Sequence, residues 1–248
     1  MRFLALWIVL CSAFVTGCAT APVTGRSQLI LVSASEENQM GLSAADEVLK
    51  TAKKSENQAL VARVTNVGKK IVAASEDAKA YQWEFFVLED DTVNAFALPG
   101  GKVFFYTGIL KLMKNDDQIA TVMGHEIAHV LAHHGAERVS QQQVAQVGGS
   151  VLGAVVGGSQ YGQLVNSAYG ITANYGVLMP FSRKHESEAD QIGVYLMFHA
   201  GYNPQEAVNF WQAMAAQNKD KAPEFLSTHP SDDRRIKDIE AYIKKLKK

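Results

Sequence analysis

The sequence predicts an α+β fold that is mainly helical and contains one small antiparallel sheet. Two observations predict this class. Amphipathic patterns of helical period occupy most of the chain, and a short central stretch alternates with period two before a glycine-containing turn. At 248 residues, with 47% hydrophobic and 20% charged residues, the chain can bury one sizeable core. We therefore expect a single folded domain over 32–248.

The first 17 residues have the pattern of a signal peptide. Arg2 precedes an apolar run over 3–9 that is too short to span a bilayer permanently. The run leads into Val-Thr-Gly-Cys at 15–18, which resembles a bacterial lipobox, so Cys18 is the candidate for lipidation. An ordinary signal-peptide cysteine is the alternative. The other cysteine, Cys11, lies in the segment that would be removed, so no disulfide is expected.

Residues 18–31 are expected to be a flexible tether behind the lipidated cysteine. They are rich in Thr, Pro, Gly, Arg and Ser, and acyl chains on Cys18 would anchor them to a membrane. Ala19, where some lipoproteins have Asp, resembles an outer-membrane sorting signal. We expect an outer-membrane lipoprotein that faces the periplasm.

Two scaffold helices and a sheet are expected next. Ser33 or Ser35 can cap a helix over 36–53, and a second amphipathic helix fits 58–74. Alternation over 81–87 predicts a half-buried strand. Two further strands are predicted on either side of a Pro-Gly-Gly turn, and their ranges are 92–98 and 102–106.

The glycine-rich segment 148–162 does not favour a stable helix, because glycine loses the most backbone freedom on folding. Three interpretations stay open: a mobile flap over a cleft, a membrane-touching loop, or a tightly packed helical turn at a crossing. The lysine-rich segment 244–248 is expected to be a solvated helix end.

A helix with metal-binding spacing is predicted from Asn115 onward. Asn115 is a plausible N-cap, and Gln118 can complete a capping box. The helix continues into His-Glu-Ile-Ala-His at 125–129, followed by apolar residues that would bury it. Residues four apart share a helix face, so His125 and His129 can place two ring nitrogens on one tetrahedral metal ion.

Glu126 lies beside that face and is the candidate general base, because it can deprotonate the attacking water and pass the proton to a leaving amine. A catalytic zinc needs a third protein ligand and an open fourth position. Ala132 and Gly135 stand where a metzincin would have Gly and His, so that class is excluded.

The best remaining donor is Glu186, on a second predicted helix over 183–190. Asp190, one turn later on the same face, can accept the outer N–H of a ligand histidine. The alternative for this stretch is a charged surface helix without a ligand. Substitution of Glu186 should weaken zinc retention, whereas substitution of Glu188 should not.

These motifs resemble the metallopeptidase family of HtpX and the CAAX prenyl proteases. Because no multi-helix membrane domain is visible, the chain is most similar to the soluble periplasmic lipoprotein branch. The resemblance runs from about Leu31 to Ile239. Its motifs are His125-Glu126-x-x-His129, Glu186-x-x-Ala189-Asp190, Asn94-Ala95-Phe96-Ala97, Pro180-Phe181-Ser182-Arg183 and Thr228-His229-Pro230.

The resemblance implies a gluzincin fold, a zincin-type metallopeptidase domain whose active-site helix packs against the small antiparallel sheet. It also implies that the edge strand receives substrate as an added extended strand. Plain strand packing is compatible with that role. The matching residues are Asn94, Ala95, Phe96 and Ala97.

The resemblance implies two further site residues. His229 would face the cleft, where it could stabilise the oxyanion or occupy the fourth zinc position at rest; an exposed loop histidine is the alternative. Arg235 would brace the site through a carboxylate, and an ordinary surface arginine is the alternative. The remaining histidines receive no role at the metal: His133 and His134 are expected to be structural, and His185 and His199 are unassigned.

The expected function is zinc-dependent endopeptidase activity in a bacterial envelope, with one Zn²⁺ per chain and Glu126 as general base. The expected substrates are misfolded or unassembled envelope proteins. Expected partners are the membrane, through the lipid at Cys18, and possible assembly machinery, whereas a net charge of −1 argues against nucleic acid. The competing interpretation is a protein that holds unfolded clients around a structural zinc. The intact Glu126 argues against it, because a structural zinc needs no base.

Overall fold

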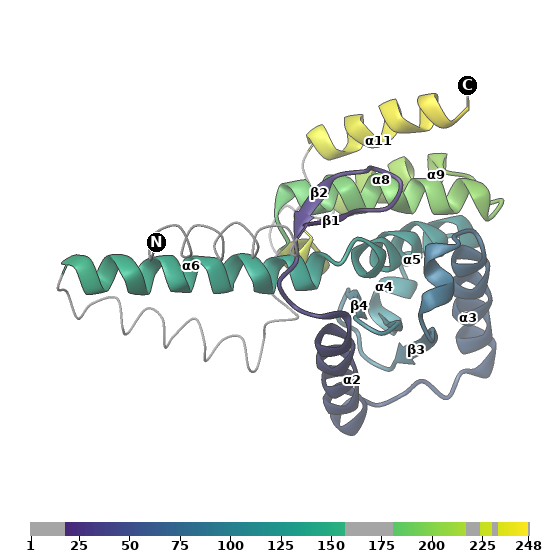
Figure 1. Cartoon of the computed structure of the whole chain (residues 1–248). Coiled ribbons are helices and arrows are strands. Elements are labelled where there is room, and N and C mark those ends of the chain that lie inside the picture. Colours follow the sequence, from purple (N-terminus) through teal and green to yellow (C-terminus); the bar gives the residue numbers. More distant parts are fainter. Residues whose placement is uncertain (1–17, 157–180, 217–223, 230–232, 248) are drawn as a thin grey trace.

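The computed structural model describes residues 18–156, 181–216, 224–229 and 233–247 of the chain, and helices dominate these ranges (Figure 1). The expected α+β class is confirmed. In chain order the elements are β1 (Cys18–Thr20), β2 (Ser27–Leu29), α2 (Ala34–Thr51), α3 (Gln58–Ala73), the 3-10 helix η1 (Asp77–Ala80), β3 (Glu84–Leu88), β4 (Ala95–Leu98), β5 (Lys102–Tyr106), α4 (Thr107–Leu110), α5 (Asp116–Leu131), α6 (His134–Val156), α8 (Arg183–His199), α9 (Gln205–Ala216), α10 (Glu224–Thr228) and α11 (Asp233–Leu246).

Helix α2 begins where its capping residue requires. The Ser33 hydroxyl accepts from the Glu36 backbone N–H, and the Glu36 carboxylate accepts from the Ser33 N–H, which completes a capping box. Ser33 is therefore the cap, and the helix starts two residues earlier than predicted. Helix α3 begins at Gln58 as predicted, and the Asn57 side chain caps it by accepting a hydrogen bond from the Leu60 N–H.

The central sheet has three strands in the order β3-β5-β4. Strand β4 pairs antiparallel with β5, but β3 pairs parallel with β5, so the expectation of a purely antiparallel sheet was wrong in this respect. The reason is that β3 adds to the far side of β5 instead of joining its sequence neighbour β4. Gly100 and Gly101, with φ of +85° and +93°, make the turn between β4 and β5 in a conformation that favours glycine.

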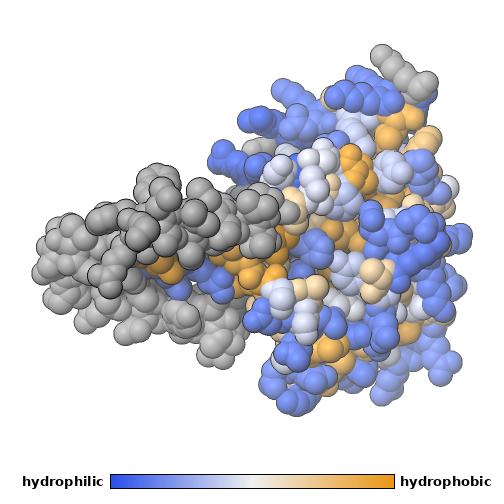
Figure 2. Space-filling model, in the orientation of Figure 1, coloured by the Kyte–Doolittle hydropathy of each residue, from blue (hydrophilic) through white to orange (hydrophobic). Residues whose placement is uncertain are grey.

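Helix α5 lies at the centre of the core. Every residue from Gln118 to Leu131 is buried, and α3, α8, α9 and β4 all contact this helix. Helices α5 and α8 approach closely where Gly124 meets Gly193, since a Cβ on Gly193 would lie 2.9 Å from the His125 backbone nitrogen. Hydrophilic side chains cover most of the visible surface of the described residues, with smaller apolar areas between them (Figure 2).

The segment expected to be a flexible tether instead contains paired strands. Strands β1 and β2 pair antiparallel, and Ala21 between them is buried in the core. β2 also contacts α6. The candidate signal peptide over 1–17 lies outside the described residues.

The glycine-rich segment is helical as far as the structure describes it. Residues 148–156 form the end of α6, which extends away from the body of the molecule (Figure 1). The expectation that glycine would disfavour a helix was therefore wrong for these residues, while 157–162 lie outside the described part. In the described ranges no helix combines the length and apolarity needed to cross a membrane.

Candidate metal centre

Helix α5 presents two histidine rings from one face. The Asn115 side chain accepts from the Gln118 N–H at 2.9 Å and so starts the helix at Asp116, as predicted. Nine residues on, His125 and His129 lie one turn apart, and their Nε2 atoms are 3.1 Å from each other. Both rings are buried, and burial holds the pKa of His129 well below 6.5, so this ring is neutral and its lone pair is available.

Helix α8 brings a carboxylate to the same point. Ser182 caps α8 by accepting from the His185 N–H, which places Glu186 in the first turn. Glu186 Oε2 lies 3.4 Å from His125 Nε2, and Glu186 Oε1 lies 3.4 Å from His129 Nε2. Gly124, next to His125, and Gly193 let the backbones of the two helices approach closely.

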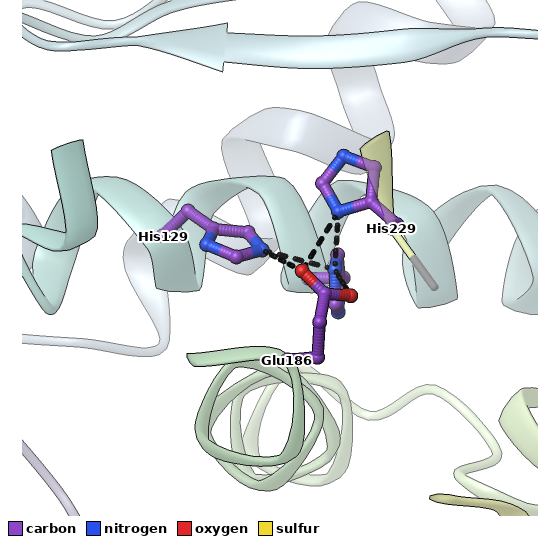
Figure 3. Close-up of side chains that lie close together, drawn as sticks. His129, Glu186 and His229 are labelled. Atoms are coloured by element: carbon purple, nitrogen blue, oxygen red, sulfur yellow. Dashed lines mark hydrogen bonds and ion pairs between the residues drawn. The ribbon is translucent and has the colours of Figure 1, made fainter. Parts of the chain in front are cut away.

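His229 is the fourth member of the cluster. It directly follows α10, and its Nδ1 lies 3.1 Å from His125 Nε2 and 3.2 Å from Glu186 Oε1. Figure 3 shows His129 on α5, Glu186 on α8 and His229, which follows α10, pointing towards one another. His229 is 2% exposed, so the interpretation as an exposed loop histidine does not hold.

The four side chains fit a zinc ion. One ligand atom from each of His125, His129, Glu186 and His229 lies within 4.8 Å of the others. Three imidazole nitrogens and a carboxylate oxygen are ligands that zinc prefers. Each imidazole nitrogen carries either one hydrogen or one lone pair, so hydrogen bonds alone cannot satisfy all the close contacts within the cluster. Within the described ranges, Glu126 Oε1 is also buried without a hydrogen bond. A cation in the cluster would compensate its charge.

Asp190 and Arg235 support this cluster from behind. His125 Nδ1 lies 3.0 Å from Asp190 Oδ1, and the Arg235 guanidinium donates to both oxygens of Asp190. Arg235 Nη1 also lies 2.8 Å from Glu186 Oε2. Burial alone would raise the pKa of Glu186, but Arg235 and the neighbouring histidines hold it well below its usual range. Arg235 stacks on Trp211 and is 4% exposed, so it is no surface arginine.

Glu126 lies between the cluster and the sheet. Its Oε2 accepts from the Ala97 backbone N–H at 3.1 Å, and its Oε1 lies 3.4 Å from His229 Nε2. Burial raises the pKa of Glu126 to about 7. A carboxyl group with this pKa can accept and return a proton near neutral pH.

Of the four residues predicted to bind substrate, three make packing or side-chain contacts, and one directs its backbone N–H towards Glu126. Ala95 is buried, Phe96 stacks on Phe104, and Asn94 donates to Glu224 at 3.1 Å. Ala97 instead directs its N–H towards Glu126. In the described part of the chain β4 pairs with β5 alone, and the Ala97 N–H on its other edge reaches Glu126.

The structure gives His134 and Glu188 contacts that the sequence analysis did not predict. His134 Nδ1 lies 2.8 Å from His129 Nδ1, and His134 Nε2 lies 3.0 Å from Glu188 Oε2. A helical pattern could not reveal this contact, because α5 ends at Leu131 and His133 turns the chain with φ of +49°. His133 itself points to Glu37, away from the cluster, as expected.

The other histidines and one aromatic ring also have defined neighbours. His185 Nε2 lies 3.2 Å from Glu137 Oε2, and the His199 ring contacts Tyr195. Phe181 stacks on His129 with 3.9 Å between ring centroids, although the sequence analysis gave this phenylalanine no individual role.

Comparison with known proteins agrees with this centre. Residues 58–243 match Peptidase family M48. The chain is 36% identical over 264 residues to mitochondrial metalloendopeptidase OMA1 of Saccharomyces cerevisiae, covering 98% of this chain and 74% of that protein. It is 41% identical over 182 residues to its counterpart in Schizosaccharomyces pombe, covering 73% and 52%. It is 30% identical over 234 residues to the β-barrel assembly-enhancing protease of Escherichia coli, covering 91% and 47%.

These relatives correct one prediction. The chain was expected at a bacterial outer membrane, but the two fungal relatives, at 36% and 41% identity, are named as mitochondrial enzymes. The expected location is contradicted on this ground. The chain also spans only about half the length of the S. pombe and E. coli relatives, at 52% and 47%.

Proposed function

Because the chain belongs to peptidase family M48 and is a zinc metalloendopeptidase, we propose that His125, His129 and Glu186 hold its zinc and that Glu126 is its general base. The observation that carries this proposal is the convergence of these buried ligand atoms within 4.8 Å. When bound, zinc supplies a Lewis acid that polarises the scissile carbonyl and lowers the pKa of water.

Glu126 takes the proton from the attacking water and returns it to the leaving amine. The Ala97 N–H fixes one oxygen of Glu126, which leaves Oε1 to exchange the proton. The pKa of about 7, raised by burial, suits both transfers because a base works best near the ambient pH.

Substrates bind as extended strands along β4. The edge of β4 that pairs with no described strand adjoins Glu126, so main-chain pairing there would set a scissile peptide beside the base. Pairing through the main chain reads little of the side-chain sequence. The substrate class is therefore unfolded or unassembled polypeptide, and cleavage tolerates many sequences.

His229 occupies the fourth donor position in the resting enzyme. Its Nδ1 approaches both His125 and Glu186, which would close the site to substrate until His229 withdraws. Four protein donors are also the pattern of a structural zinc, as in a protein that only holds clients. The buried Glu126, which such a zinc does not need, favours the protease.

The finer assignments rest on resemblance. Likeness to a protein named a β-barrel assembly-enhancing protease supports a role beside protein assembly machinery. Specific kinship with HtpX and the CAAX prenyl proteases, and lipid attachment at Cys18, remain proposals of the same kind.

The test compares the purified chain with Glu126→Gln on unfolded casein. The parent should cleave casein, and this cleavage should stop when a chelator removes the zinc. Glu126→Gln should keep about one zinc per chain, but its kcat/KM should be about 10²–10⁴-fold lower. Glu47→Gln, an exposed change on α2, is the matched control and should cleave as fast as the parent. Equal cleavage by Glu126→Gln would refute the assignment of the base.

A further inference from the structure

The outer nitrogen of His129 faces a buried series of polar groups that leads to the loop between β1 and β2. His134 Nδ1 lies 2.8 Å from His129 Nδ1, and His134 Nε2 lies 3.0 Å from Glu188 Oε2. Glu188 in turn accepts from Arg26 Nε at 2.6 Å and from the Thr24 hydroxyl. His134 is fully buried and Glu188 nearly so.

When His129 Nε2 is a metal ligand, the hydrogen bonds from His129 through His134 to Glu188 can run in one direction only. That nitrogen then carries a lone pair, so the neutral ring has its hydrogen on Nδ1 and donates to His134. His134 Nδ1 must accept, which leaves its hydrogen on Nε2 to donate to Glu188. A carboxylate that can only accept therefore sets the direction of both hydrogen bonds.

The partners of Glu188 agree with this direction. Arg26 Nε, which can only donate, and His134 Nε2 meet the same carboxylate oxygen, Oε2, and the Thr24 hydroxyl donates to the other oxygen. Glu188 is therefore an acceptor at this point.

The two histidines on α5 have matching support. His125 Nδ1 contacts Asp190, which is held by Arg235. His129 reaches Glu188 through one extra imidazole, and Glu188 is held by Arg26. Both carboxylates lie on α8, two residues apart, so each ligand ring is oriented by an acid–arginine pair.

We propose that Arg26 and Glu188 are positioning residues for His129, acting through His134 to fix the tautomer and orientation in which His129 binds the metal. This inference rests on the proposed zinc site. It makes the loop between β1 and β2, over 100 residues before His129 along the chain, a part of the metal centre.

Arg26 also joins two helices behind His129. Its Nη1 and Nη2 lie 2.7 and 2.6 Å from the two carboxylate oxygens of Glu137 on α6, while its Nε binds Glu188 on α8. Gln28 donates to the same Glu137 at 2.9 Å. Loss of Glu137 would thus loosen Arg26 without touching His134, which separates a general structural role from the proposed orienting role.

The experiment measures zinc loss from the zinc-loaded full chain to an excess of chelator, for Glu188→Gln and for the control Glu137→Gln. Glutamine can donate as well as accept, so Glu188→Gln removes the fixed direction. It should release zinc about 10–100-fold faster than the parent, and Glu137→Gln clearly less so. Long-range ¹H–¹⁵N NMR should show one His129 tautomer in the parent and a changed His134 signal in Glu188→Gln.

Equal zinc release by Glu188→Gln and the parent, or an equal acceleration by Glu137→Gln, would overturn the proposal. If Glu188→Gln does not fold, Thr24→Val removes one hydrogen bond to Glu188 at constant volume; it should speed zinc release by a smaller factor, and no change would again overturn the proposal. Failure of the parent to bind zinc would instead refute the proposed function.

Discussion

Replacing Gly193 with alanine tests how closely α5 and α8 must approach to form the metal centre. The new Cβ would lie 2.9 Å from the His125 nitrogen, 3.0 Å from the Gly124 carbonyl carbon and 3.2 Å from the Gly124 oxygen. These are backbone atoms, so no side chain can turn aside. Ordinary contact begins at 3.4 Å, and the helices must therefore separate by about half an ångström.

That separation has two measurable effects. Overpacking of this kind costs about 1–3 kcal/mol. Since α8 also carries Glu186 and Asp190, its shift moves one proposed ligand and one supporting carboxylate away from His125. A misplacement of about 1 Å can cost 10²-fold in rate, so half that shift should lower kcat/KM on the order of tenfold.

Gly135→Ala is the matched control. Gly135 lies in α6, and among the described residues the nearest atom to its added Cβ is Pro99 Cγ at 4.0 Å. Gly193 lies in the interior of α8, where alanine gains ~1 kcal/mol of helix propensity, whereas Gly135 lies in the first turn of α6 and gains no more than that. A lower stability of Gly193→Ala than of the control therefore comes from the contact. Urea denaturation should place Gly193→Ala about 1–3 kcal/mol below Gly135→Ala. Equal stability and equal activity of the two variants would refute the reasoning.

Two further predictions concern protonation and the fourth donor. The free energy of unfolding should decrease as the pH falls, because the pKa of Glu137 and the pKa of Glu188 are about 2 in the folded protein and 4.5 in the free group. The stabilisation from these two carboxylates is present above pH 4.5 and is lost as the pH falls through about 2. Glu137→Gln should flatten this dependence in urea titrations at several pH values, and an unchanged slope would contradict the assignment. His229→Ala should raise kcat/KM on a short unstructured peptide if His229 closes the resting site, whereas a decrease would favour its alternative role at the oxyanion.

Local signals in the sequence predicted most of what is local in the structure. Capping by Ser33 and Asn115 and the one-turn spacing of His125 and His129 depend on neighbouring residues, and all are present. The parallel pairing of β3 with β5 was not predictable in this way, because it depends on which side of β5 accepts a third strand.

The support behind His129 was missed for a similar reason. His134 returns to His129 only because α5 ends and His133 adopts a positive φ, and no helical periodicity encodes that turn. Arg26 lies 162 residues from Glu188, in a segment whose composition resembles a linker. The role of Arg26 depends on tertiary contacts. The sequence predicted that substitution of Glu188 would not weaken zinc retention, and the proposal made from these contacts reverses that prediction.

The position of the metal ion itself tests the central claim most directly. Crystals of the zinc-loaded chain, measured on both sides of the zinc absorption edge, should give one anomalous peak about 2.0–2.2 Å from the Nε2 atoms of His125 and His129 and from a carboxylate oxygen of Glu186. A peak bound elsewhere, or one that excludes Glu186, would contradict the account.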